Sequence, residues 1–138
     1  MLIRESVGKK INNAADVAKI LRAILQTEDK IDRDKEHFWA IALDTQHKIK
    51  FIELVTLGTL SGSLVHPREV FRLAISEAVC SLIIGHNHPS GNLNPSKEDI
   101  AITKRLKESG EIIGIKLLDS IIINESGEHT SLKETGLM

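Results

Sequence analysis

The chain has 138 residues, of which 41% are apolar, and its formal net charge is −1 at pH 7. This length and apolar content suit one domain that buries its own core, and a near-zero charge disfavours a protein that tracks a phosphate backbone. No apolar run approaches the roughly 20 residues of a membrane helix, and MLIRESVGKK at the start lacks the pattern of a signal peptide. We therefore expect a cytoplasmic protein with no membrane partner.

The first predicted element is a helix. Asn12 and Asn13 can cap it, and its apolar residues recur at the spacing of one helix face: Val17, Ile20, Leu21, Ile24 and Leu25. A charged run, QTEDKIDRDKEH, follows this helix. The next stretch, FWAIALDTQHKIKFIELVTLG, is interpreted as two strands joined by a turn at residues 44–47, and it predicts a hairpin.

Helices and strands alternate after the hairpin. A second helix is predicted from about Pro67, because proline suits a first turn, and SLIIG predicts a short buried strand. A third helix is predicted from near Pro95 to Gly110, with the glycine as a left-handed terminator. IIGIKLLDSIIIN and EHTSL predict late strands. Cys80, the only cysteine, excludes a disulfide framework and a cysteine-rich zinc site, and we expect it to be buried near a helix end.

The order of these elements predicts an α/β (α+β) fold, in which a single mixed-sheet domain is flanked by helices. The whole chain, 1–138, is expected to form this one domain. Residues 1–30 would supply an N-terminal extension and helix, and residues from about 36 to 138 would form the core.

The stretch IIGHNHPSGNLNPSKEDI contains the candidate site. Side chains alternate faces in an extended segment, so His86 and His88 should project to the same side, and Pro89 restricts His88 to extended backbone angles. Two imidazoles placed in this way can bind one metal ion. They can equally flank an ordinary turn at a strand end, and the histidine pair alone does not decide between these interpretations.

Asp99 is a third possible ligand. Ser96 and Asp99 have the spacing of a helix capping box, but Asn94 followed by Pro95 supplies a rival cap that would leave both residues inside the helix. Asp99 would then share a helix face with apolar Ile102 and point toward the core. Burying a lone carboxylate is costly, and a metal cation is one group that offsets this cost.

Two imidazoles and one carboxylate leave a fourth tetrahedral position for water, as in catalytic zinc sites, and zinc activates such a water as a nucleophile. Ser96 could donate to the oxyanion that forms. Glu53 is the candidate general base, since it is the only charged residue in FIELVTLGTL, whose pattern is that of an interior strand. The alternative is a strand-end glutamate that reaches solvent, and Glu69 and Glu77 of the second helix compete for the role.

The pattern of His86-x-His88, seven residues, Ser96, two residues and Asp99, with Glu53 upstream, resembles the JAB/JAMM (MPN) motif. Members of that superfamily are zinc metalloproteases that include isopeptidases acting on ubiquitin-like tags. More narrowly, the chain looks like the JAB domain of bacterial RadC-like proteins, often labelled DNA repair proteins. The segments that carry this resemblance are GTLSGSLVHPREVF, GHNHPSGNLNPSKEDI, IKLLDSIII and SLKETGLM, and it covers roughly residues 15–138.

This resemblance implies a JAB/MPN (cytidine deaminase-like) architecture and zinc-dependent hydrolysis of peptide or isopeptide bonds. It implies that His86, His88 and Asp99 bind zinc, that Glu53 is the general base acting on a zinc-bound water, and that Ser96 is the oxyanion donor. The implied partner is a protein or peptide substrate, and an oligomer is possible.

Two features depart from the family. RadC-like proteins carry an N-terminal helix-hairpin-helix region associated with DNA binding, and the segment before Asn13 is too short to hold one, so nucleic acid is not the expected partner of this domain alone. Ser120 stands where many members have histidine, which would change a contact behind the metal ligands. We interpret His66, in VHPRE, as structural, and expect the other histidines in polar surroundings to be exposed: His37, His47 and His129.

Two other functions fit parts of the pattern. A nucleic-acid module for DNA repair or a mobile element would use the metal for nuclease chemistry, but the charge and the missing hairpins weigh against it. A catalytically silent protein-binding domain is the other alternative, although every part of the motif is retained.

Overall fold

A computed structural model describes residues 1–58 and 65–138, so part of the GTLSGSLVHPREVF segment lies outside the described residues. The elements run in the order β1 (Leu2–Ile3), α1 (Ala14–Gln26), α2 (Lys30–Arg33), β2 (Glu36–Leu43), β3 (Ile49–Gly58), α3 (Pro67–Ser76), β4 (Ser81–Asn87), α4 (Lys97–Ile113), β5 (Lys116–Ile123) and β6 (His129–Ser131). These elements form one mixed sheet flanked by helices, which confirms the expected fold class.

The sheet has the strand order β1-β3-β2-β4-β5-β6. Only the β4–β5 pair is parallel among these strands, because α4 forms the crossover that parallel neighbours require. The predicted hairpin is confirmed as β2 and β3. Asp44 closes its turn, since one carboxylate oxygen accepts the backbone N–H groups of Gln46 at 2.8 Å and Lys48 at 2.9 Å.

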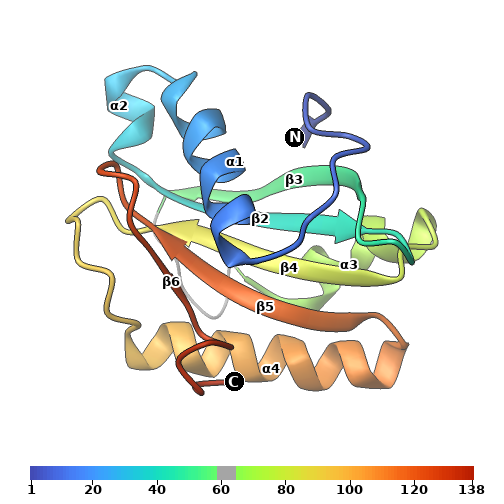
Figure 1. Ribbon diagram of the computed structural model, residues 1–138. Coiled ribbons are helices and arrows are strands. Elements are labelled where there is room, and N and C mark those ends of the chain that lie inside the picture. Colours follow the sequence, from blue (N-terminus) through green and yellow to red (C-terminus); the bar gives the residue numbers. More distant parts are fainter. Residues whose placement is uncertain (59–64) are drawn as a thin grey trace.

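Helices cover both faces of the sheet, with α1 on one side and α4 on the other (Figure 1). Alternation along β2 divides the core between these faces: Phe38 packs with Phe71 and Leu106 on the α3–α4 side, and Trp39 packs with Leu21 on the α1 side. Within residues 1–58 and 65–138, no helix has the length and apolar character needed to cross a membrane.

The first two predicted helices begin where their caps place them. Asn13 Oδ1 accepts the backbone N–H of Asp16 at 3.0 Å and starts α1. Pro67 is the first residue of α3, and His66 Nδ1 accepts the backbone N–H of Arg68 at 3.0 Å. His66 is therefore a helix cap, in agreement with its structural interpretation.

The third predicted helix differs from expectation at both ends. It begins at Lys97 with Ser96 as its cap, because the Ser96–Asp99 capping box satisfies two backbone donors reciprocally and so prevails over the rival cap at Asn94. It continues to Ile113 and terminates at Gly114, whose φ is 90°. Gly110 instead lies inside the helix.

The structure differs from the sequence-based expectations at four further points. The charged run contains the short helix α2, capped by Asp29, and the unpredicted strand β1 pairs with β3. His37 is fully buried rather than exposed, because its ring stacks on Trp39 with centroids 5.1 Å apart and Nε2 lies 2.7 Å from Glu28 Oε2. Cys80 is exposed, not buried.

Candidate metal centre

Three potential ligands converge where β4 ends and α4 begins. His86 lies on β4, His88 lies just beyond it, and Asp99 comes from the first turn of α4. The two Nε2 atoms are 3.1 Å apart; Asp99 Oδ1 lies 3.3 Å from that of His86, and Asp99 Oδ2 lies 3.0 Å from that of His88. One ligand atom from each residue lies within 4.8 Å of the others. The structure thus brings together the histidine pair and the aspartate singled out in the sequence.

Asp99 belongs to the capping box and to this cluster at once. Its Oδ2 accepts the backbone N–H of Ser96 at 2.9 Å, while Ser96 Oγ accepts the backbone N–H of Asp99 at 3.0 Å. The same carboxylate faces both histidines. The capped helix and the metal site are therefore one arrangement, not alternatives, and the cap fixes the orientation of the carboxylate.

The donor set fits a metal ion. His88 Nδ1–H donates to the Asn92 carbonyl at 2.6 Å, so a neutral His88 ring carries its lone pair on Nε2, the atom that faces the cluster. The facing Nε2 atoms of His86 and His88 can share at most one hydrogen bond. A cation bound between them would instead accept a lone pair from each nitrogen. His86, His88 and Asp99 are thus positioned to bind a metal ion.

The cluster is electrostatically coupled. Burial alone would raise the pKa of Asp99, but hydrogen bonds from His86 and His88 hold it far below its usual range. The hydrogen bond to Asp99 raises the pKa of His88, whereas burial lowers it. The Asn92 carbonyl and the charge of Glu36 also raise this pKa. The carboxylate is therefore ionised, as a metal ligand must be.

A second set of contacts lies behind His86. Its ring is 3% exposed and stacks on Phe38, and its Nδ1 has no hydrogen-bond partner among the described residues. Thr103 Oγ1–H donates to the Asp99 carbonyl at 2.9 Å and lies 3.1 Å from Ser120 Oγ. Ser120 therefore contacts Thr103, and both border a small space beside His86.

A cleft of about 740 Å³ opens over His88 and Asp99. It is lined by the segment after β4 together with Ser96, and by residues 34–36 and Gly58. Ser96 Oγ accepts one hydrogen bond from Asp99, which leaves its hydroxyl proton available to a bound molecule. The wall side chains include more carboxylates than cations: Asp34, Glu36 and Glu98 against Lys35.

Glu53 does not join the three ligands in the structure. Glu53 on β3 pairs with Ala40 on β2, and Ala40 pairs in turn with Ile84 on β4. Glu53 therefore lies two strands away from β4 and is level with Ile84 along the strand direction. It is only 9% exposed, and burial raises its pKa, with smaller effects from the N-terminus, Arg72 and Glu69. Among the described residues, Glu53 lines neither the cleft nor the space beside His86.

Glu36 is a further carboxylate of the cleft, one that the sequence did not single out. Phe38 of β2 pairs with His86 of β4 in an antiparallel register. Glu36 lies two residues before Phe38 and His88 lies two residues after His86, so this register directs Glu36 toward His88. Strand alternation puts it on the same side as Phe38. It lines the cleft, and its charge acts on His88. Finding it required the pairing of β2 with β4, which no local pattern reveals.

The side chain between the two histidines points to the other face, as strand alternation predicts. Asn87 is 2% exposed, and its Oδ1 accepts the backbone N–H of His37 at 2.6 Å. Its Nδ2 donates to the carbonyls of Lys35 at 3.0 Å and Arg33 at 3.4 Å. The strand that bears the histidines is thus attached to the segment that bears Glu36.

Similarities to known proteins extend over most of the chain. A family model described as RadC-like JAB domain matches residues 11–137. A UPF0758 protein of Desulforamulus reducens is 52% identical over 114 residues, which are 83% of this chain and 50% of that protein. A UPF0758 protein of Caldanaerobacter subterraneus is 43% identical over 136 residues, or 99% of this chain and 56% of that one. The chain spans about half the length of the curated relatives it matches.

Proposed function

The chain belongs to the RadC-like JAB domain family, and from this premise we propose that it is a zinc-dependent hydrolase of peptide or isopeptide bonds. The observation that carries the proposal is the convergence of His86, His88 and Asp99 beside a cleft. Two imidazoles and a carboxylate suit zinc better than magnesium or calcium, which prefer all-oxygen sites. Three protein ligands leave a position open, as in catalytic sites.

Each of the chain's own groups has a separate role in this proposal. A bound zinc ion supplies Lewis acidity, which acidifies a water molecule and polarises a carbonyl. Glu36, which lines the cleft with His88, accepts the proton of the attacking water and delivers it to the leaving amine. Ser96 donates a hydrogen bond from its hydroxyl group to the carbonyl oxygen as negative charge develops there. The capping box holds Ser96 and Asp99 in fixed relation while this happens.

We assign the general base to Glu36 in preference to Glu53. A base has to lie within hydrogen-bond reach of the proton it removes, and Glu36 lines the cleft whereas Glu53 lies two strands from β4. Arg72 and Glu69, the charged side chains that act on Glu53, belong to α3. We therefore expect Glu53 to affect stability rather than the chemical step.

The charges of the cleft favour a peptide over a phosphodiester substrate. Asp34, Glu36 and Glu98 line it with Lys35, and a nucleic-acid strand would bring its phosphates against these carboxylates. A peptide backbone carries no charge of its own, so it meets no such repulsion.

The decisive experiment is hydrolysis by the zinc-loaded protein, screened against peptide, isopeptide and duplex DNA substrates before and after chelation. We expect cleavage of an amide substrate that chelation abolishes and added zinc restores. Glu36→Gln should reduce the rate by about 10²- to 10⁴-fold with zinc retained, and Glu53→Gln serves as the matched control with near-normal rate. Amide cleavage that persists undiminished after chelation, or cleavage of DNA alone, would reject the proposal.

A further inference from the structure

A groove of about 580 Å³ lies between α3 and α4, on the face of the sheet that these helices share. Phe71, which is 1% exposed, belongs to its floor. Three of its residues are isoleucines that remain unusually accessible: Ile75 at 56%, Ile112 at 88% and Ile113 at 43%. Single exposed apolar side chains are ordinary, but several gathered around one groove mark an interaction surface.

The close approach of the two helices fixes the shape of this groove. A Cβ at Gly110 of α4 would collide with the Ile115 carbonyl and lie 3.2 Å from Phe71 Cζ. The glycine therefore lets α4 pack directly on the ring that forms the floor. Ser76 and Ser109, which also line the groove, are small polar residues that leave the isoleucines as the main contact surface.

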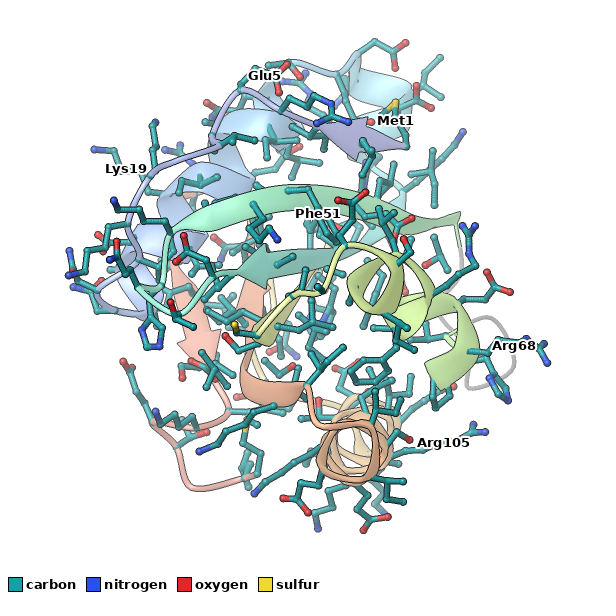
Figure 2. The ribbon with its side chains drawn as sticks, turned by 90° about the vertical axis from the view of Figure 1, so that its right-hand side faces the viewer. Met1, Glu5, Lys19, Phe51, Arg68 and Arg105 are labelled. Atoms are coloured by element: carbon teal, nitrogen blue, oxygen red, sulfur yellow. The ribbon has the colours of Figure 1, made fainter. Side chains whose placement is uncertain are left out.

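Two arginines of α3 line the groove beside its apolar residues. Arg68 and Arg72 of α3 have side chains that are 74% and 70% exposed, and each is paired with Glu69 only at a long distance, 3.8 Å and 4.0 Å. Pairs this exposed and this long are weak, so both guanidinium groups can turn to another carboxylate. Arg105 lies one helical turn before Ser109 on α4, and Figure 2, which looks along α4, shows Arg68 and Arg105 on the same side of the molecule.

The arginine charges help to decide whether the groove binds a second copy of the chain or a different protein. In a two-fold dimer the same patch faces itself, so Arg68 and Arg72 would approach their own counterparts and repel them. The groove also offers nine lining residues, whereas a stable interface needs about 20 to 30 on each side. Its size fits a single amphipathic helix, whose anchors recur every three or four residues.

We propose that the α3–α4 groove binds an amphipathic helical segment of another protein, with large apolar side chains on one face and acidic residues flanking them. The segment would place its apolar side chains against Phe71 and the three isoleucines, and its carboxylates beside Arg68 and Arg72. The groove residues of α4 follow Asp99 by ten or more positions, which is roughly 15 to 20 Å along the helix. The groove and the metal centre therefore lie toward opposite ends of α4, and this proposal does not rest on the proposed hydrolase function.

The probe is a pair of synthetic helical peptides of about 18 residues, with leucine anchors at three- and four-residue spacing. One has glutamate flanks and the other has lysine flanks at the same positions. Fluorescence anisotropy with the full chain should show the acidic peptide binding at least about tenfold more tightly than its lysine twin, and salt should narrow this difference. Equal binding of the two peptides, or no binding of either, would overturn the proposal.

Variants locate the binding surface. Arg68→Glu combined with Arg72→Glu should reverse the preference, so that the lysine peptide binds more tightly. Ile112→Asp should weaken binding of the acidic peptide by about tenfold or more. Ile112 is 88% exposed, so its replacement should leave the fold intact. Ile31→Asp is the matched control, because Ile31 is 75% exposed on α2 and does not line the groove. An equal loss of peptide binding in Ile112→Asp and Ile31→Asp would contradict the assignment. Concentration-dependent dimerisation of the wild-type chain that Ile112→Asp abolishes would also contradict it.

Discussion

Asn87 Oδ1 accepts the backbone N–H of His37 at 2.6 Å, across the face of the sheet opposite the metal centre. The same amide group donates to the carbonyl of Lys35, so Asn87 holds both residues that flank Glu36. Because His86 and His88 flank Asn87 in turn, one buried side chain fixes the spacing between the candidate ligands and the candidate base.

Asn87→Ala should lower the free energy of unfolding by about 1–3 kcal/mol, because it leaves the buried backbone N–H of His37 without its partner. Amide hydrogen exchange at His37 should accelerate by more than this global change explains. Chemical denaturation and exchange measurements test both effects. Asn12→Ala, at an exposed position, is the control, and unchanged protection of the His37 amide would contradict the role of Asn87.

Gly110→Ala should destabilise the fold by about 1–3 kcal/mol through overpacking. The added methyl group meets the Ile115 carbonyl and approaches Phe71, and neither the backbone nor the buried ring can move away easily. Glu111→Ala, at the next and exposed position of α4, controls for helix propensity. Thermal denaturation measures both variants; a glycine variant as stable as the control would show that the Ile115 carbonyl and the Phe71 ring can move aside at no cost.

Glu53 should make stability depend on pH. Burial raises its pKa above the usual 4.5, so the folded chain holds this proton at pH values where the unfolded chain has released it. The stabilisation from protonated Glu53 is complete below the unfolded pKa and is lost as pH rises through the folded pKa. The stability of wild type relative to Glu53→Gln should therefore fall over the pH interval that begins near the ordinary value of 4.5 and ends at the raised pKa of Glu53. A difference that stays constant over this interval would contradict the assignment.

Binding to duplex DNA should be no tighter than the non-specific range, roughly 10⁻⁴ to 10⁻⁶ M at physiological salt. The net charge is −1, and the cleft walls carry Asp34, Glu36 and Glu98, so few cations are available to displace condensed counterions. Sequence preference should also be absent. A salt titration that reveals nanomolar affinity would instead favour the nucleic-acid module among the alternatives.

The sequence was informative where the signal is local. Asn13 identified the start of α1, Asp44 marked the hairpin turn, and the alternation of His86, Asn87 and His88 placed the two imidazoles on one side. Each of these features depends on residues within a few positions of one another. The spacing from His88 to Asp99 also suggested the third ligand, although two possible helix starts left its orientation open.

Long-range pairing set the limit of sequence reasoning. Glu36 lines the cleft because β2 pairs with β4, whereas Glu53 on β3 is not among the described residues that line it. Nothing in the residues around either glutamate distinguishes these outcomes. His37 likewise lies in a polar stretch and is nevertheless buried, because Trp39 and Glu28 enclose its ring.

The zinc content of the purified chain tests the central claim most directly. Elemental analysis should find about one zinc ion per wild-type chain, since the described residues contain one cluster that could supply three protein ligands. His86→Ala, His88→Ala and Asp99→Ala should each lose most of it, while Glu36→Gln and Glu53→Gln should keep it because neither is assigned as a ligand. Full zinc retention in all three ligand variants would contradict the metal centre and leave only a capped helix beside a turn.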